Sequence, residues 1–482
     1  MFSSSQSSYA GKRARGDDDD DDNSDSQQFL FDMQDDGSLV DPDDKREKFC
    51  IVNVGNSVKR DKIEGKEDKV KIIANWNFKG GVGKTTSSFG LAYAFCEKKN
   101  CKVMMVDADP QKNLTQLISR YYRSRYFNNP TSLAPIEDAL NEANCGFHRA
   151  MNRALKSNRI EPASLIAVDI EDSPDLDADW DPKFRGHLLR DKLFLLPGSF
   201  ATSLLERELY CGYEYNPGTS DAPRVGGYPA VFWNLIRRTA AVHNIEYVIV
   251  DLSPAFSVLN TNIIFSSNLF VVPCAPERFS IEALRSIPSI LAGGNFFQKH
   301  IAWMKRFERT VQDSKDLGID ESYLKFPTHA VQFAGVMITR FPYKSIALQN
   351  NADNDTKYVF QPSSDMVSRF IDEIYAQSVV LAQSLPRCVT RIVSSLNWVN
   401  NHELELGRFP EFHQLGLIAQ NSSIPCGYLT NRLMKVNNVT RLNARRCRYH
   451  HRESLEIIVD KLCDNFLNAV DLVPIEQDST EG

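Results

Sequence analysis

The residues best suited to chemistry lie in one glycine-rich stretch, which reads KGGVGKTT from Lys79 to Thr86. It falls between a predicted strand and a predicted helix. Glycines let the backbone wrap closely around a phosphate, so that N–H groups and the helix N-terminus point at the anion. In such a loop Lys84 would reach the β- and γ-phosphates of a nucleotide, and the hydroxyl of Thr85 would bind Mg²⁺. The predicted nucleotide site comprises Lys79, Gly80, Gly81, Val82, Gly83, Lys84, Thr85 and Thr86.

Three carboxylates follow apolar runs and could complete such a site. Asp107 and Asp109 come two apart after a run that ends at Val106, so their side chains are expected on the same side. Asp251 ends another apolar run, where a carboxylate can hold Mg²⁺ through water. Without the glycine-rich loop we would interpret Asp107 and Asp109 as a surface turn. With the loop, they become candidate site residues.

Short apolar runs that alternate with helical stretches would position these residues. A continuous apolar run indicates a strand buried on both faces, as in a parallel sheet covered by helices. Apolar residues at helical spacing predict a helix over residues 85–98. The predicted strands are 70–74, 102–106, 193–196, 247–250, 269–272 and 334–338. The expected fold class is α/β, with a doubly wound, mostly parallel sheet and helices on both faces.

The glycine-rich loop departs from the usual pattern G-x-x-x-x-G-K-[ST]. Phe78 stands where the first glycine belongs, and Lys79 precedes the glycine pair. The sequence K-G-G-x-G-K-T resembles the deviant P-loop of the ParA/MinD family of ATPases. Ser253 stands where that family usually has proline. Further stretches resemble the family in its own order, and they are 106–111, 193–208, 251–262, 271–284, 335–340 and 385–387.

This resemblance implies a P-loop NTPase fold and an enzyme that hydrolyses ATP with Mg²⁺, slowly and with partner stimulation. In the family, the lysine at the position of Lys79 reaches across an ATP-dependent homodimer to the partner's phosphates, as an arginine finger does. Asp109 would help to orient the attacking water. Pro273 would lie near the adenine or the dimer face, and Thr339 near the adenine. The implied catalytic residues are Lys79, Lys84 and Asp109, and the implied magnesium residues are Thr85, Asp107 and Asp251.

Charge and composition divide the chain unevenly. Thirteen Asp against five Lys or Arg give residues 1–46 a charge of −8, whereas the whole chain carries −6. Residues 1–47 are therefore predicted to be a disordered acidic tail, because they hold too few apolar groups to offset the entropy of ordering. The other predicted parts are a linker at 48–69, an ATPase domain at 70–400 with an insertion at about 121–190, and a C-terminal extension at 401–482 whose last helix runs from Glu453 to Val470.

The purpose of ATP hydrolysis stays open between several classes. A ParA-like partition ATPase would bind DNA without sequence preference, and a ParB-like partner would trigger its release. Its cargo would be a plasmid, a chromosome or a viral genome. The alternative interpretation of the basic C-terminal cluster is a solvated helix end or a counter-ion for the acidic tail. The candidate DNA contacts, which would be strongly salt-dependent, are Arg441, Arg445, Arg446, Arg448 and Arg452.

Three other classes are weighed against partition. A membrane-cycling ATPase like MinD would need an amphipathic helix with a basic face, but the last predicted helix has an acidic one, which favours core packing. A metal-cluster carrier would need paired cysteines, and the ten cysteines include no C-x-x-C. A slow nucleotide-gated adaptor for a protein assembly stays open. Scattered cysteines and no run of about 18 apolar residues predict a cytoplasmic protein without membrane insertion, associated with the nucleoid, or nuclear in a eukaryotic or viral source.

Overall fold

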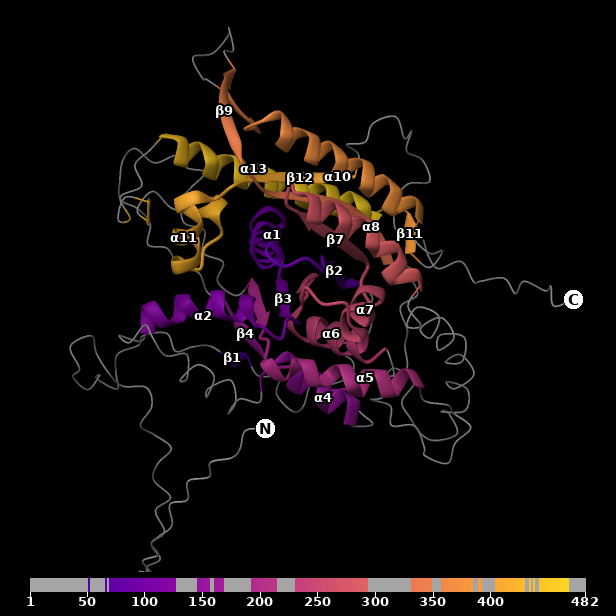
Figure 1. Ribbon diagram of the computed structural model, residues 1–482. Coiled ribbons are helices and arrows are strands. Elements are labelled where there is room, and N and C mark those ends of the chain that lie inside the picture. The colour runs from indigo at the N-terminus through magenta and orange to yellow at the C-terminus, as the bar shows by residue number, and fades with distance from the viewer. Residues whose placement is uncertain are drawn as a thin grey trace, which may run out of the picture. The chain divides into compact units, whose positions relative to one another are not determined.

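The structure is a computed structural model that describes the central sheet, its helices and the candidate site (Figure 1). The predicted acidic tail, 1–47, and most of the predicted linker, 48–69, lie outside the described residues. The described residues are 51–52, 66, 69–126, 145–156, 160–168, 192–214, 230–293, 331–348, 357–384, 389–391, 404–429, 433–434, 437 and 442–467.

A ten-stranded, mostly parallel sheet runs through the described part of the chain. Its parallel strands follow the spatial order β5 (Leu193–Leu196), β3 (Val103–Asp107), β6 (Tyr247–Asp251), β2 (Lys71–Asn75), β7 (Leu269–Cys274) and β8 (Val331–Phe341). Both β11 (Val389–Arg391) and β12 (Glu405–Pro410) pair in parallel with β8. At the other edge, β4 (Leu165–Ala167) and β1 (Ile51–Val52) are antiparallel. The predicted fold class, a doubly wound α/β sheet of the P-loop type, is confirmed.

All six predicted strands are confirmed, with ends that move by up to three residues. Their apolar side chains are buried because helices cover both faces of the sheet. The largest difference is in β8, which begins at Val331 rather than Ala334. The polar Gln332 interrupts the apolar run there, yet it is buried between β7 and β11 in the sheet.

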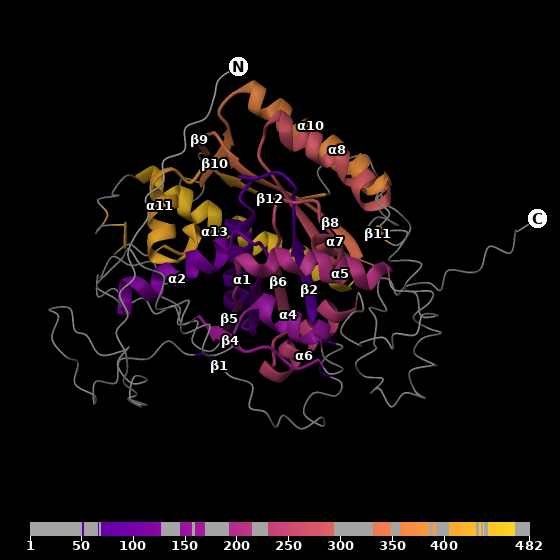
Figure 2. The ribbon, with the colours of Figure 1, turned by 60° about the horizontal axis from the view of Figure 1, so that its bottom comes forward.

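The helices divide between the two faces of the sheet (Figures 1 and 2). One face carries α1, α2, α11 and α13, and the other carries α4, α5, α6 and α7, as right-handed crossovers require. A separate hairpin joins β9 (Tyr343–Leu348) to β10 (Lys357–Pro362). The helices are α1 (Lys84–Lys99), α2 (Asn113–Tyr126), α4 (Phe147–Lys156), α5 (Leu205–Glu214), α6 (Val231–His243), α7 (Val258–Phe265), α8 (Arg278–Gly293), α10 (Asp365–Ser384), α11 (His413–Ser422) and α13 (Leu442–Leu467), with short 3-10 turns η4 (Phe200–Leu204) and η7 (Cys426–Tyr428).

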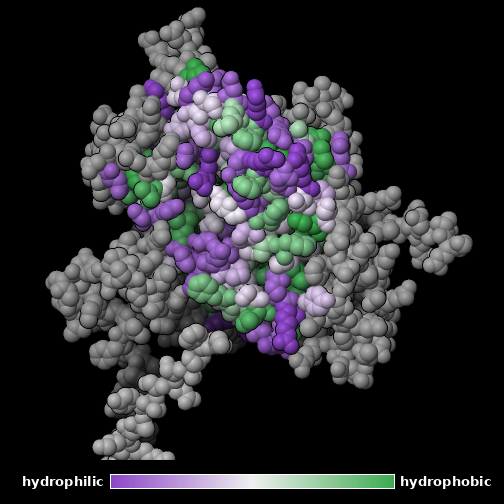
Figure 3. All heavy atoms as spheres, viewed as in Figure 1, coloured by the Kyte–Doolittle hydropathy of each residue, from purple (hydrophilic) through white to green (hydrophobic). Residues whose placement is uncertain are grey.

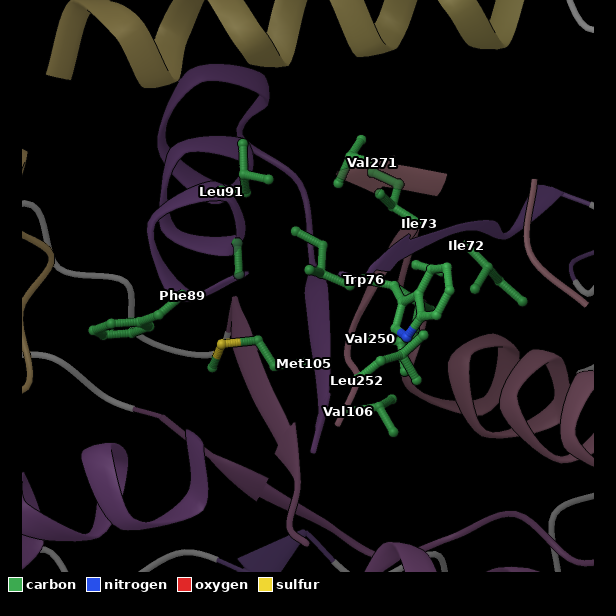
Figure 4. Packing of buried hydrophobic residues seen from close by; sticks show 14 of the residues in the cluster. Ile72, Ile73, Trp76, Phe89, Leu91, Met105, Val106, Val250, Leu252 and Val271 are labelled. Atoms are coloured by element: carbon green, nitrogen blue, oxygen red, sulfur yellow. The ribbon is translucent and has the colours of Figure 1, made fainter. Parts of the chain in front are cut away.

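The core lies between the sheet and these helix layers. Figure 4 shows Ile73 of β2, Leu91 of α1, Val250 of β6 and Trp76 after β2 gathered in it. The described cysteines are free thiols, and most are buried. Because this core is close-packed, it holds the first turns of α1, and with them the preceding loop, in place.

Two predicted appendages contribute to the sheet. The predicted insertion, 121–190, includes β4 and α4, which pack beside β5 and α6. The predicted C-terminal extension includes β12, which pairs with β8, and α13, which packs on α1 and β12. Lys48–Gly482 form one compact unit. The domain boundaries themselves stay a prediction.

The last helix begins eleven residues earlier than predicted, at Leu442 instead of Glu453. Its buried stripe of Leu455, Ile458, Leu462 and Phe466 is confirmed as core. The same stripe continues toward the N-terminus through Cys447, Arg448 and His451 at helical spacing. The sequence did not predict this continuation, because the basic and aromatic residues of 442–452 resemble a polar segment.

Candidate nucleotide-binding site

Three polar residues end neighbouring strands at the carboxyl edge of the sheet. Asp251 of β6 lies opposite Asn75 of β2 on one side and opposite Asp107 of β3 on the other. Ligands of open α/β sheets bind at this edge, where loops and helix N-termini converge. The chain therefore brings two of the three predicted carboxylates, Asp107 and Asp251, side by side at this edge.

The glycine-rich loop turns sharply into α1. Gly81 and Gly83 have φ of 77° and 80°, in the left-handed region that other residues adopt only with strain. A side chain on Gly80 would meet nothing within 4 Å, so this part of the loop faces open space. Gly83 is the N-cap of α1, and no side chain caps this described turn. The N–H groups of the first turn are therefore free to bind an anion.

Lys84 is buried in this loop, with 7% of its surface exposed. Its Nζ donates to the backbone oxygen of Lys79 at 2.9 Å, so the side chain crosses the loop. Burial lowers the pKa of the Lys84 ammonium, while Asp251 and Asp109 raise it. The two carboxylates thus offset part of the cost of holding a cation beside the loop.

Thr85 and Asp251 offer oxygen atoms where a magnesium ion is predicted. The Thr85 hydroxyl donates to Asp251 Oδ2 at 2.8 Å, and Ser88 donates to Oδ1 at 3.0 Å. Burial raises the pKa of Asp251 to about 6, against the two hydroxyl hydrogen bonds that lower it. In the described residues, no group of three or more His, Cys, Asp or Glu could hold a metal ion. Hydroxyl and carboxylate oxygens at the mouth of a phosphate loop fit Mg²⁺, which keeps several waters and phosphate ligands.

Asp107 is held by the start of α2, and its place near magnesium stays a prediction. Its Oδ2 accepts hydrogen bonds from the backbone N of Thr115 at 2.8 Å and from the Thr115 hydroxyl at 2.7 Å. Thr115 in turn accepts a hydrogen bond from the backbone of Gly198 at 2.8 Å. Burial, together with the charge of Asp251, raises the pKa of Asp107 to about 7, against the two Thr115 hydrogen bonds that lower it. Asp107 therefore ties the start of α2 to the end of β5.

Asp109 lies beyond the end of β3, so strand alternation does not place it with Asp107. Its Oδ1 accepts a hydrogen bond from the backbone of Gln111 at 2.9 Å. Burial raises the pKa of Asp109, while the Gln111 hydrogen bond and the charge of Lys84 lower it. The carboxylate is thus held in a tight turn within electrostatic reach of the loop lysine.

Lys79 points away from the loop, toward the start of α8. Its ammonium forms an ion pair with Glu277 and lies 5.5 Å from the centre of the Phe279 ring. Its backbone N donates to Asn77 Oδ1 at 2.9 Å, and Asn77 Nδ2 donates to the Pro273 oxygen at 2.8 Å. The structure thus places Pro273 beside the strand that leads into the loop.

The end of β8 also contacts the loop. The Thr339 hydroxyl donates to the Val82 oxygen at 2.7 Å, and Arg340 Nη1 donates to the Gly81 oxygen at 2.8 Å. The contact of Thr339 with an adenine stays a prediction, and its hydroxyl is bonded to the phosphate loop. The predicted residue is therefore in the site.

The segment after Asp251 is held by α7. Asn260 Nδ2 donates to the backbone oxygens of Ser253 at 3.0 Å and Ala255 at 2.7 Å. A cavity of about 390 Å³ lies beside this segment and is lined by Pro110, Ser203, Glu206, Ser253, Ala255, Phe256, Ser257, Val258 and Leu259. The turn of Asp109 and the segment after Asp251 thus border the same hollow.

Known proteins resemble this chain over part of its length. Residues 70–170 match the family model AAA_31, described as an AAA domain. The virulence plasmid ParA family protein pGP5-D of Chlamydia psittaci is 33% identical over 112 residues, which are 23% of this chain and 38% of that protein. The chain is similar to the ParA/MinD family of P-loop ATPases.

Two further matches extend the comparison. The uncharacterized protein MJECL24 of Methanocaldococcus jannaschii is 25% identical over 214 residues, which are 44% of this chain and 62% of that protein. The matches therefore span less than two thirds of both curated relatives. The crystal structure of DIP2308 from Corynebacterium diphtheriae aligns with a TM-score of 0.45 and 18% identity over 73% of this chain and 97% of that chain.

Two arginines of the basic cluster of this ParA/MinD-like chain are held inside the fold. Arg448 is 2% exposed and donates to the Leu429 oxygen at 2.6 Å. Arg452 pairs with Glu97 of α1 at 2.7 Å and with Glu456 at 2.9 Å. The prediction is wrong for these two arginines because they face the core side of α13. Of the others, Arg446 is half-buried, and the side chains of Arg441 and Arg445 lie outside the described residues.

Sequence reasoning missed several polar residues around the ParA/MinD-like loop. Asn75, at the end of β2, donates to the Lys84 oxygen at 2.9 Å and to the hydroxyls of Ser87 and Ser88. Asn77 and Glu277 fix the backbone and the side chain of Lys79. The available signal was one asparagine that ends an apolar strand and a second two residues later, directly before a phosphate loop, because buried polar side chains need partners.

Proposed function

We propose that the protein is a ParA-like ATPase that binds and hydrolyses ATP with Mg²⁺ and forms an ATP-gated homodimer that positions DNA cargo. The observation that carries this proposal is the division of work between two lysines of one loop. Lys84 lies inside the loop, whereas Lys79 extends out of it toward α8. A lysine directed away from its own loop suits a site that a second subunit completes.

Each residue of the site has a distinct task in this proposal. The N–H groups of Gly80 to Thr86 bind the phosphates, and Lys84 balances their charge. Thr85 and Asp251 would hold Mg²⁺, which supplies charge neutralisation to the phosphates when it is bound. Asp109, buried beside Lys84, orients the attacking water and is placed to accept its proton.

Nonspecific DNA is the proposed partner of the dimer, and a ParB-like protein is the proposed regulator. The name of the Chlamydia psittaci relative, which assigns it to the ParA family of a virulence plasmid, supports a role in partition. With Arg448 and Arg452 buried in ion pairs and hydrogen bonds, the DNA surface of this proposal must use other basic groups. The proposed location is the nucleoid in the cytoplasm, or the nucleus in a eukaryotic or viral setting.

The membrane-cycling alternative is not favoured by any observation on the described residues. The apolar stripe of α13 packs on α1 and β12, so this stripe is not presented to lipid. No described helix is both long enough and apolar enough to cross a bilayer. Figure 3 shows hydrophilic and hydrophobic residues interspersed on the described part of one face. A slow nucleotide-gated adaptor stays a second proposal.

Rates of ATP turnover, with and without nonspecific DNA, test the proposed function. Lys84→Ala removes the cation of the phosphate site, so we expect ATP binding and turnover to fall by at least tenfold. Asp109→Ala removes the group that orients water, so turnover should fall while the ATP-bound dimer and its DNA complex persist longer. Asp372→Ala, at an exposed carboxylate of α10, serves as a control that should change neither quantity.

Two outcomes would contradict the proposal. If ATP does not promote dimerisation or DNA binding of the wild type, the partition function fails. If Asp109→Ala turns over ATP at the wild-type rate, the assignment of the water-orienting carboxylate fails, although the nucleotide site could stand.

A further inference from the structure

The end of β8 grips three consecutive residues of the phosphate loop. Thr339 donates its hydroxyl hydrogen to the Val82 oxygen at 2.7 Å, and Arg340 donates from Nη1 to the Gly81 oxygen at 2.8 Å. The side chain of Thr339 also lies 3.6 Å from the position that a Cβ on Gly83 would occupy. The middle of the loop, from Gly81 to Gly83, therefore contacts the end of β8.

Two successive strand residues cannot ordinarily reach the same neighbour. In an extended strand, side chains alternate between the two faces. Arg340 departs from this rule because its φ is 54°, in the left-handed region that a residue with a side chain rarely adopts. Such conformations persist where the surroundings fix them, and they gather at functional sites. The turn at Arg340 brings its guanidinium to the loop that Thr339 already contacts.

These two hydrogen bonds fix the direction of the loop amides. In a planar trans peptide the C=O and the following N–H point in opposite directions. Holding the Gly81 oxygen toward β8 turns the N–H of Val82 away from β8, and holding the Val82 oxygen does the same for Gly83. The N–H groups are thereby directed to the inner side of the loop, where an anion binds.

We propose that Thr339 and Arg340 are positioning residues that set the phosphate cradle before a nucleotide arrives. This inference rests on the proposed function, since it concerns the same site. It differs from the sequence-based expectation for Thr339, which was contact with the base. A base contact would affect the choice between nucleotides, whereas a cradle contact affects every ligand that carries a diphosphate.

Calorimetric titration with MgADP, MgGDP and inorganic pyrophosphate separates these roles. We expect Thr339→Val to weaken MgADP and pyrophosphate alike, by about three- to tenfold, which is the loss of one hydrogen bond. The ratio of ADP to GDP affinity should stay unchanged. Thr339→Ser keeps the hydroxyl, so it should restore affinity to within about twofold of the wild type.

Thr239→Val is the matched control for buried hydroxyl loss. Thr239 lies on α6, on the opposite face of the sheet, and donates to the Leu235 oxygen at 2.7 Å. Arg340→Gln should likewise weaken pyrophosphate binding, whereas Arg285→Gln should not, because Arg285 pairs on the surface with Glu282 and Glu373. Both controls keep the loop contacts intact.

The positioning role is overturned if Thr339→Val leaves pyrophosphate binding unchanged, or if it changes the ADP to GDP ratio instead. It is also overturned if Thr239→Val weakens binding as much, since general destabilisation would then explain the loss. A wild-type protein that binds none of the three ligands would refute the proposed function itself. The two failures are therefore distinct.

Discussion

At the residue scale, the two lysines of the loop are held by very different surroundings. Lys84 is buried and bonded to the loop backbone. Lys79 and Glu277 have 22% and 43% of their side chains exposed, so their ion pair is partly solvated. A pair of this kind contributes little stability and breaks readily. Glu277 can therefore hold Lys79 in a single chain and release it when a stronger anion is presented.

Replacing Glu277 by Gln should strengthen dimerisation in MgATP by about 1.5- to 5-fold. The Lys79 ammonium would then no longer have to leave a carboxylate before it reaches a phosphate of another subunit. Sedimentation velocity over a range of protein concentrations measures the change. Glu282→Gln, at an exposed carboxylate on the same helix that pairs with Arg285, is the matched control. Equal or weaker dimerisation of Glu277→Gln would show that Glu277 assists Lys79 instead of retaining it.

At the element scale, α13 is fastened to the helix that follows the phosphate loop. Arg452 pairs with Glu97 of α1, and both side chains are largely buried. A side chain on Gly427 would come within 2.7 Å of the Arg452 backbone, so η7 and α13 touch directly. His451 stacks on Phe412, with ring centres 4.4 Å apart, and on Phe409 at 5.8 Å. The C-terminal helix thus braces α1 from outside.

Arg452→Met should lower the free energy of unfolding by about 3 kcal/mol, because it leaves Glu97 as a buried charge without this partner. Arg285→Met removes a surface pair and should cost less than about 1 kcal/mol. Urea unfolding measures both. If Arg452 instead served DNA, its replacement would weaken DNA binding without a loss of stability, which is the contrary result.

Acid should weaken the packing of α13 where His451 stacks on Phe409 and Phe412. Burial and the nearby His450 together lower the pKa of His451 to about 3, against a backbone hydrogen bond with Pro410 that raises it. In the unfolded chain a histidine has a pKa of about 6.5, so the folded state binds fewer protons. The contribution of the neutral His451 to the free energy of unfolding is therefore complete above about pH 6.5 and falls as the pH falls. The loss amounts to about 3 kcal/mol near pH 4.5.

His451→Gln cannot take up this proton, so its unfolding free energy should fall less between pH 7 and pH 4.5 than that of the wild type. Urea titrations at several pH values provide the comparison. His148→Gln, at a half-buried residue of α4, is a control that should keep most of the wild-type pH dependence. Parallel pH profiles for wild type and His451→Gln would refute this account.

At the scale of the whole molecule, local rules predicted the sheet and the loop, and tertiary contacts decided the rest. The glycines before Lys84 and the apolar runs carry their structure in their own composition, so these elements could be read directly. The partner of Thr339 could not, because Val82 lies 257 residues away in the sequence. The partner of Asp107 is only eight residues away, but the turn into α2 that brings Thr115 back to Asp107 has no apolar pattern to predict it. The prediction that Arg448 is exposed failed because its acceptor, the Leu429 oxygen, is distant in the sequence. A charged residue is usually exposed, and only the fold shows a buried partner.

The packing of α13 on α1 has a consequence for folding during synthesis. Lys98 at the end of α1 donates to the Glu456 oxygen at 2.8 Å across 358 residues of chain. At a synthesis rate of about 5–20 residues per second, roughly 20 to 70 s separate the emergence of these two segments. During that time the face of α1 that receives α13 has no cover from its own chain. The helix that follows the phosphate loop is thus synthesised early but covered by α13 only late. Throughout that interval the nascent chain is exposed to chaperones and to misassembly.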